Sequence, residues 1–250
     1  MSAYEALAGV YDQLTGDVGY DRRADYIEKL FKRSRIPVHT VLDLACGTGE
    51  MTAILTERGY ELISVDASPE MLAQAREKAA GLEGEPPVFL NQTMTGLDLY
   101  GTVDAAICCL DSLNYLTSPK DVQKCFQKLH LFIAPGGVLV FDVNSLAKLA
   151  ALDGQVFLDE TEDVYCVWRT EFEKRSGICS YWMDIFTRRE DGAWDRAGEE
   201  HRQRGYAVDE LKTWLMEAGF NRIRTFGDCR MSTPKETEQR IYFCATRGAN

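Results

Sequence analysis

Apolar and polar positions follow two different periods along this chain, and the change of period divides it into regions. Between residues 35 and 150, short apolar runs alternate with segments whose apolar residues recur at helical spacing. The helical spacing predicts helices that begin near Met51, Pro69 and Asp121. The runs are too short for helices and predict buried parallel strands over 41–45, 61–66, 88–91, 103–109 and 138–144.

The pattern changes after residue 150. Residues 155–206 lack helical periodicity and alternate polar residues with aromatic and β-branched ones. This alternation predicts antiparallel strands over 164–172 and 178–188, with turns at Ser176-Gly177 and Asp191-Gly192. A helix over 208–218 follows and ends at Gly219, and strands over 220–226 and 240–246 are predicted to pair at one edge of the sheet.

These elements predict an α/β fold. We expect a Rossmann-like, seven-stranded, mostly parallel sheet with helices on both faces and an inserted antiparallel β layer. No linker divides the chain, so a single domain is predicted over 1–250. Its parts are an N-terminal helical cover over 1–34, a core over 35–150 and 207–250, and a β lid over 151–206. A dimer surface is the alternative role for this insert.

A glycine turn follows the first predicted strand. Gly47 and Gly49 link that strand to a helix, an arrangement that forms a nucleotide-type cradle at the carboxyl end of a sheet. A dinucleotide fingerprint would have Gly or Ala at the position of Thr52. The carboxylate of Asp43 would repel a pyrophosphate and attract an ammonium group. S-adenosylmethionine carries an ammonium and a sulfonium and no phosphate, so the turn favours this cofactor, although Asp43 capping its own loop is the structural alternative.

A second carboxylate ends the next strand. Asp66 stands close to the ~20-residue offset at which an acidic residue binds the ribose hydroxyls in nucleotide-binding folds. Ser68, Pro69 and Glu70 follow as N-cap, first helical residue and first-turn acid. Because Ser68 already serves as the cap, we assign Asp66 to the ribose.

Together these two stretches resemble the class I S-adenosylmethionine-dependent methyltransferases. The motifs are Asp43-Leu44-Ala45-Cys46-Gly47-Thr48-Gly49 and Val65-Asp66-Ala67-Ser68-Pro69-Glu70-Met71-Leu72. Further stretches, 4–12, 111–116 and 201–206, resemble a small bacterial group of undefined substrate, so the resemblance covers nearly the whole chain. With the glycine turn it implies a cofactor-binding set of Tyr11, Asp43, Ala45, Gly47, Gly49, Asp66, Ala67, Met71, Thr93, Met94, Cys109 and Leu110.

The adenine contacts depart from the family's pattern. Members of the family usually place an acidic residue after the third strand to hold the adenine amino group, and Gln92-Thr93-Met94 occupies that place here. Thr93 or Gln92 is then expected to contact the amino group, and Met94 to cover the ring.

The acceptor side is predicted from the N-terminal segment, the ends of the fourth and fifth strands, and a presumed strand that carries residues 201–206. The resemblance implies that Tyr11 and Tyr20 face the methyl group or the acceptor, where a ring stabilises a cation by ~0.5–2 kcal/mol; packing on the sheet is the alternative. The predicted catalytic residues are Tyr11, Asp111, Asn114 and His201, with His201 or Asp111 as base where one is needed. The predicted substrate-binding residues are Tyr20, Tyr115, Asn144 and Arg204. Turn formation for Asp111 and Asn114, and a structural salt bridge for Arg204, are the alternatives.

Charge, cysteine spacing and the length of the apolar runs argue against nucleic-acid-binding, metal-binding and membrane proteins. The formal net charge of −11 disfavours a nucleic-acid partner. The eight cysteines and three histidines show no metal-ligand spacing, so we expect reduced thiols and no metal. No apolar run is long enough to span a membrane, and the first residues lack the signal-peptide pattern, which predicts a cytoplasmic protein with no membrane partner.

The predicted function is transfer of a methyl group from S-adenosylmethionine to a nitrogen or oxygen of a small-molecule acceptor, by a monomer or homodimer. A non-catalytic regulatory protein that binds S-adenosylmethionine, and a methyltransferase acting on a protein or RNA, are the alternatives. An NAD-type oxidoreductase is opposed by Asp43 and Thr52.

Overall fold

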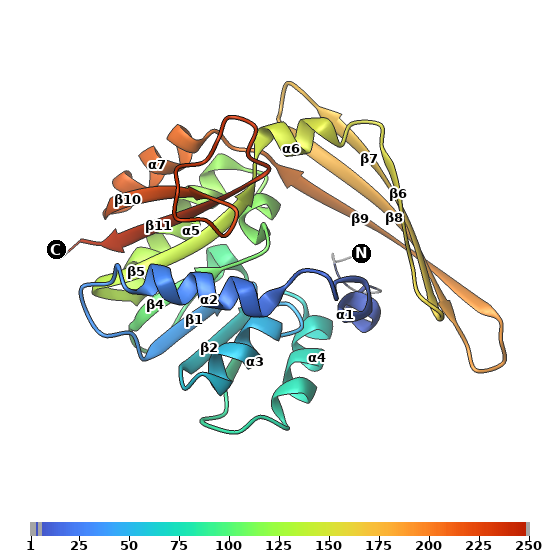
Figure 1. Cartoon of the computed structure of the whole chain (residues 1–250), viewed down its shortest axis with the longest axis horizontal. Coiled ribbons are helices and arrows are strands. Elements are labelled where there is room, and N and C mark those ends of the chain that lie inside the picture. Colours follow the sequence, from blue (N-terminus) through green and yellow to red (C-terminus); the bar gives the residue numbers. More distant parts are fainter. Residues whose placement is uncertain (1–3, 5–6, 249–250) are drawn as a thin grey trace.

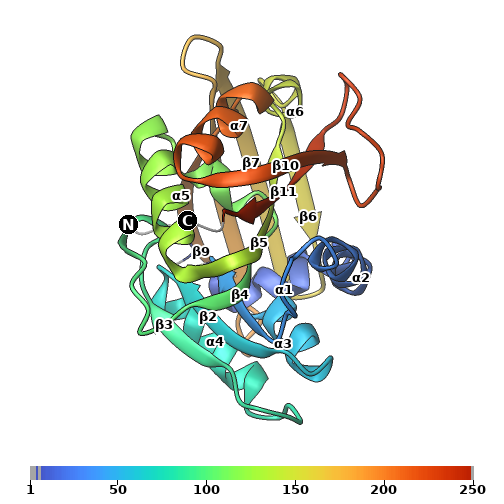
Figure 2. The same ribbon diagram turned by 90° about the vertical axis from the view of Figure 1, so that its left-hand side faces the viewer.

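The computed structural model describes Tyr4 and residues 7–248 of the 250-residue chain. Its larger sheet has seven strands within these residues (Figures 1 and 2), namely β1 (Thr40–Leu44), β2 (Glu61–Asp66), β3 (Val88–Asn91), β4 (Val103–Cys108), β5 (Ile133–Asn144), β10 (Phe220–Gly227) and β11 (Arg240–Arg247). They lie in the order β10-β11-β5-β4-β1-β2-β3. Only the pairings of β11 with β5 and with β10 are antiparallel. The predicted Rossmann-like fold is therefore confirmed.

Both faces of this sheet are covered. The helices of the described chain are α1 (Tyr11–Leu14), α2 (Tyr20–Phe31), α3 (Glu50–Glu57), α4 (Pro69–Ala79), α5 (Pro119–Phe132), α6 (Leu146–Ala151) and α7 (Val208–Glu217), with 3-10 turns at Ala8–Val10, Met94–Gly96 and Ser112–Tyr115. Leu42 and Leu44 of β1 pack in one core with α5 and α7, whereas Val41 packs in another with α2 and α3. Burial on both faces explains the nearly unbroken apolar runs.

The helix starts and most strands agree with the sequence pattern. Ser68 caps α4 by accepting a hydrogen bond from the Met71 amide at 3.1 Å, with Pro69 as the first helical residue. β5 begins at Ile133, earlier than the predicted residue 138. In the described chain no helix has the length and apolar character to cross a membrane. All eight cysteines are free thiols.

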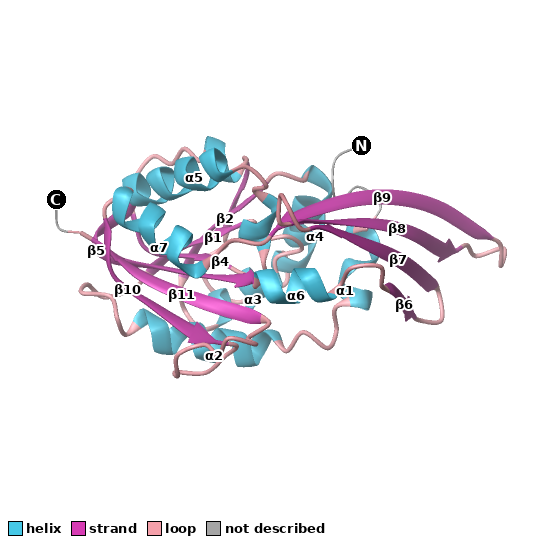
Figure 3. Cartoon of the chain, turned by 90° about the horizontal axis from the view of Figure 1, so that it is seen from above, coloured by secondary structure: helices cyan, strands magenta, loops and turns pink. Residues whose placement is uncertain are grey.

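The insert forms a separate antiparallel sheet that extends beyond the body of the molecule (Figures 1 and 3). Its strands are β6 (Val156–Glu160), β7 (Val164–Glu173), β8 (Ile178–Arg188) and β9 (Trp194–Arg204), and each one pairs with the next along the chain. The predicted strands and both predicted turns are confirmed. α6 and β6 were not predicted; β6 is an edge strand with mostly exposed residues, so it lacks a clear apolar alternation.

The N-terminal segment, predicted as a helical cover over 1–34, is not helical at Tyr4. Tyr4 lies in a turn with φ +67°, and among the described residues the first helical turn is Ala8–Val10; residues 1–3 and 5–6 lie outside the described residues. The physical reason is a competing acceptor. The amides of Tyr4 and Leu7 donate to the side-chain carboxylate of Glu199 on β9, at 3.0 and 2.9 Å. Leu7 and Val10 then pack on Val164 of the inserted sheet.

Substituting Gly49 is expected to destabilise the fold. Gly49 has φ +77°, and an added Cβ would lie 2.9 Å from the Cβ of Ala75 on α4. We expect Gly49→Ala to lower the free energy of unfolding by ~1–3 kcal/mol, measured by urea denaturation. Gly81→Ala, where the added Cβ meets open space, is the control and should change it by less than ~0.5 kcal/mol. Equal stability of the two variants would contradict close packing at Gly49.

Candidate active site

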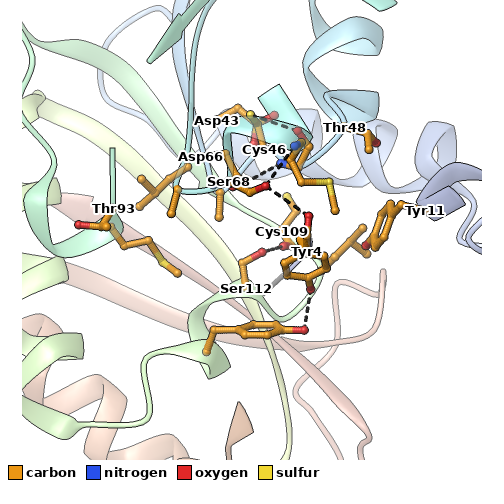
Figure 4. Close-up of a pocket in the computed structure, with 18 of the residues that line it drawn as sticks. Tyr4, Tyr11, Asp43, Cys46, Thr48, Asp66, Ser68, Thr93, Cys109 and Ser112 are labelled. Atoms are coloured by element: carbon orange, nitrogen blue, oxygen red, sulfur yellow. Dashed lines mark hydrogen bonds between the residues drawn. The ribbon is translucent and has the colours of Figure 1, made fainter. Parts of the chain in front are cut away.

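A cavity of about 350 Å³ opens where β1, β2 and β4 end (Figure 4). Most of the residues predicted from sequence line it: Tyr11, Tyr20, Asp43, Ala45, Gly47, Asp66, Ala67, Met71, Thr93, Met94, Cys109, Leu110 and Tyr115. The carboxyl ends of parallel strands at a change of strand order are where ligands bind in open α/β sheets. The sequence therefore identified most of the lining.

The two glycines of the turn have different tasks. Gly47 lines the cavity with φ +57°, and the space where its Cβ would stand is open to a ligand. Gly49 does not line the cavity; it allows α3 to approach Ala75 of α4. Asp66 fixes the turn, because its carboxylate accepts the amides of Gly47 at 2.9 Å and Ser68 at 2.8 Å. The Asp66 side chain therefore shapes the cradle as well as facing it.

Asp43 is the most deeply buried carboxylate of the lining. Its side chain accepts a hydrogen bond from Thr52 Oγ1 at 2.6 Å, and only 2% of the residue is exposed. Burial raises the pKa of Asp43 to about 7, and the negative charge of Asp66 adds to the rise. Burial also raises the pKa of Asp66, while its main-chain amide partners oppose the rise.

The lining is acidic. Its charged side chains are Asp43, Glu50 and Asp66, and Glu50 is paired with Lys78 of α4. Within the described chain, the lining includes no lysine, arginine or histidine. Such a cavity suits a cationic ligand and disfavours a phosphate.

The loop after β4 is held in a strained conformation. Leu110 and Asp111 both have positive φ, +55° and +54°. Asp142 of β5 compensates, because its two carboxylate oxygens accept the amides of Leu110 at 2.8 Å and Asp111 at 3.0 Å. Arg240 forms ion pairs with both Asp142 and Asp111. Asp111 therefore faces this buried network and is absent from the cavity lining.

Three more predicted residues lie away from the cavity. Asn114, fully buried, donates from Nδ2 to the carbonyls of Asn144 and Arg204 and accepts the amide of Asn144 at 2.9 Å. The side-chain Nδ2 of Asn144 donates to Oε1 of Gln203 at 3.1 Å. Arg204 donates to the carbonyl of Thr117 at 3.3 Å. Asn114 and Asn144 therefore tie the ends of β5 and β9 together. Among the described residues Arg204 forms no salt bridge; its guanidinium lies over the ring of Tyr206, 5.2 Å from the ring centroid.

Tyrosines enclose the remaining side of the cavity. Tyr4 contacts Tyr11 and Tyr115, with ring centroids 5.9 and 5.7 Å apart. His201 lies behind Tyr115 and does not line the cavity itself; its Nδ1 is 3.1 Å from the Tyr115 hydroxyl. Tyr4 was missed as a site residue because the sequence pattern indicated only that it belongs to the N-terminal helical cover. The other lining residues that sequence reasoning missed are Leu44, Cys46, Thr48, Glu50, Ser68, Ser112 and Leu116.

Comparisons with known proteins decide the family. A family profile described as "Methyltransferase domain" matches residues 41–137. The chain is 35% identical over 249 residues to "Putative methyltransferase YqeM" of Bacillus subtilis, covering 98% of this chain and 97% of that protein. The chain belongs to the class I S-adenosylmethionine-dependent methyltransferases.

Solved structures agree with this methyltransferase fold. An S-adenosylmethionine-dependent methyltransferase from Clostridium acetobutylicum superposes with a TM-score of 0.86 at 29% identity, covering 99% of this chain and all of the other. Among sequence relatives, a glycine/sarcosine N-methyltransferase from Halorhodospira halochloris is 26% identical over 244 residues, and the match covers 90% of this chain and 82% of that protein. The protein is therefore an enzyme whose methyl donor is S-adenosylmethionine.

The raised pKa of the buried Asp43 predicts the direction in which the free energy of unfolding changes with pH. Its pKa is about 7 in the folded protein and near 3.8 in the unfolded chain, so the folded state holds the extra proton between these values. The free energy of unfolding should therefore fall as pH rises from 4 to 7, by on the order of 4 kcal/mol at most. In Asp43→Asn this contribution disappears.

Urea denaturation of the methyltransferase at pH 5 and pH 8 measures the effect. Between these pH values the parent protein should lose stability relative to Asp43→Asn. The matched control is Asp98→Asn, at an exposed carboxylate, which should keep the parent's pH dependence. Parallel pH dependence in the parent and Asp43→Asn would show that Asp43 is ionised without penalty.

Proposed function

We propose that this enzyme transfers the methyl group of S-adenosylmethionine, bound in the cavity at the strand ends, to a nitrogen or oxygen of a small-molecule acceptor. The observation that carries the proposal is the acidic cavity beneath the glycine turn. A cationic cofactor without phosphate matches this lining, and its ammonium group and ribose match the two strand-end carboxylates, Asp43 and Asp66.

Each part of the cofactor has a partner in the proposed complex. Asp43 faces the ammonium of the methionine part, whose positive charge favours the ionised carboxylate. Asp66 accepts hydrogen bonds from the ribose hydroxyls. Thr93 and Met94 lie at the adenine end; since the Thr93 hydroxyl accepts the Gly96 amide at 3.1 Å, we expect Met94 to give the main contact with the ring.

The chemistry needs little beyond orientation. The acceptor's lone pair attacks the methyl carbon in line with the carbon–sulfur bond, and the sulfur leaves as a neutral thioether. Holding the two reactants in this geometry can contribute ~7–11 kcal/mol to lowering the barrier. Tyr4, Tyr11 and Tyr115 line the cavity with aromatic rings, which stabilise a sulfonium by ~0.5–2 kcal/mol.

The cavity's size and closure favour a small acceptor. Its volume is near the lower end of the ~300–1,000 Å³ range of small-molecule sites. The N-terminal segment packs between the cavity and the inserted sheet, which supports a lid role for β6–β9. The name of the Halorhodospira relative, a glycine/sarcosine N-methyltransferase, favours nitrogen over oxygen as the atom that is methylated.

Asp66→Ala tests the cofactor site. Loss of two hydrogen bonds to a charged carboxylate, at ~1.5–3 kcal/mol each, should weaken S-adenosylmethionine binding by at least ~10-fold in isothermal titration calorimetry. Glu77→Ala, an exposed carboxylate on α4, is the control and should bind as the parent does. Unchanged affinity in Asp66→Ala would refute the ribose assignment.

An acceptor screen tests the reaction itself. The parent enzyme with methyl-labelled S-adenosylmethionine should transfer label to at least one compound in a panel of amino acids, amines without a carboxylate, amino sugars and phenols. Asp43→Asn and Asp66→Ala should transfer less to that compound. Transfer only to protein or RNA in a parallel extract would overturn the small-molecule assignment.

A further inference from the structure

Four side chains form a continuous hydrogen-bonded chain that starts at the cavity and ends in the interior. The Tyr4 hydroxyl lies 2.6 Å from the Tyr115 hydroxyl, which lies 3.1 Å from Nδ1 of His201. Nε2 of His201 lies 2.7 Å from Oε2 of Glu199. Tyr4 and Tyr115 line the cavity, whereas His201 and Glu199 are 3% and 7% exposed. Figure 4 shows Tyr4 among the residues around the cavity.

The chemistry of the two ends fixes the direction of this chain. An ionised carboxylate only accepts hydrogen bonds, so His201 must donate from Nε2–H to Glu199. In a neutral imidazole the other nitrogen, Nδ1, is then an acceptor for the Tyr115 hydroxyl. Tyr115 in turn accepts from Tyr4. Every proton therefore points away from the cavity, and the Tyr4 oxygen keeps lone pairs with which to accept a proton.

We propose that the chain Tyr4–Tyr115–His201–Glu199 takes up the proton that an amine acceptor loses on methylation, an inference that rests on the proposed function. The nitrogen lone pair forms the new bond to the methyl carbon as the carbon–sulfur bond breaks. The resulting ammonium gives a proton to the Tyr4 oxygen. Tyr4 passes its own proton to Tyr115, which passes its proton to Nδ1 of His201. The imidazolium then forms an ion pair with Glu199.

The surroundings favour a relay over proton storage on the tyrosines. Burial raises the pKa of Tyr4 and of Tyr115 above the ordinary value, so both remain neutral phenols that pass a proton on. Nδ1 of His201 is the acceptor at the end of the two hydroxyls, and the relayed proton arrives there. The titratable groups that contact this histidine are Tyr4, Tyr115 and Glu199, and Tyr181 of β8 lies opposite it in the register of the sheet. Tyr11 and Asp111 lie further along the relay, where their charges act on Tyr4.

Closure of the site and assembly of the relay are linked. Glu199 accepts the amides of Tyr4 and Leu7 in addition to its contact with His201. The same carboxylate therefore holds the N-terminal segment that carries Tyr4 to the cavity. Tyr4 is the catalytic residue of this hydrogen-bonded relay, and His201 and Glu199 act through it.

The first test needs no acceptor. Nitrogen NMR of ¹⁵N-histidine-labelled enzyme with S-adenosylhomocysteine bound, with His201 assigned by loss of its signals in His201→Gln, reports the tautomer. The expected result at pH 8 is a neutral ring protonated on Nε2, with Nδ1 as a hydrogen-bond acceptor. A ring protonated on Nδ1, or an imidazolium throughout pH 6–9, would leave no place for the proton and would overturn the relay.

The second test uses the amine identified in the screen. His201→Gln and Tyr4→Phe should lower kcat by roughly 10²–10⁴-fold and remove the acidic limb of the kcat–pH profile, because the base is lost. Their affinities for S-adenosylmethionine should stay within about twofold of the parent. Tyr165→Phe, on β7, is the matched control and should keep the parent profile.

A lower kcat with an unchanged pH profile would assign these residues a structural role only. Failure of the relay is distinguishable from failure of the proposed function. Absence of any transfer by the parent enzyme would reject the proposed function, whereas the NMR tautomer decides on the relay in the S-adenosylhomocysteine complex alone.

Discussion

Carboxylates that accept pairs of main-chain amides hold the walls of the cavity in place. Asp66 does so for the glycine turn and the start of α4, Asp142 for the loop after β4, and Glu199 for the N-terminal segment. Loop amides have no partner in a helix or strand, and a charged acceptor forms shorter and stronger hydrogen bonds than a carbonyl. The cavity therefore exists because side chains of the sheets bind the backbone of the loops.

These carboxylates are costly to bury, and the structure compensates each one differently. Asp142, fully buried, is neutralised by Arg240. Glu199 has His201 beside it. Asp66 remains partly exposed at the cavity, and its partners among the described residues are main-chain amides. A carboxylate in a desolvated site is stable as an anion only with such partners. The compensation explains why the strained Leu110–Asp111 pair persists.

Asp43 differs from these three. Within the described part of the chain its side-chain partner is a hydroxyl, that of Thr52, and burial raises its pKa to about 7. It contributes little to shaping a loop and is the group whose charge state a bound cation would change most. Within one acidic cavity, the structure thus separates carboxylates that build the walls from one whose partner is expected to be the cofactor.

The sequence by itself determined the sheet core and the part of the cavity in which we propose that the cofactor binds. Strands buried on both faces leave an unbroken apolar signal, and the glycine turn and the strand-end acids are local features that need no distant partner. The acceptor half was decided by contacts between residues far apart in the chain. Tyr4 leaves its predicted helix because Glu199 accepts its amide, and Asn114 and Asn144 turn from the cavity toward each other and β9. A local sequence pattern does not predict which distant side chain will accept a hydrogen bond from a given amide, because that depends on how the inserted sheet packs against the core.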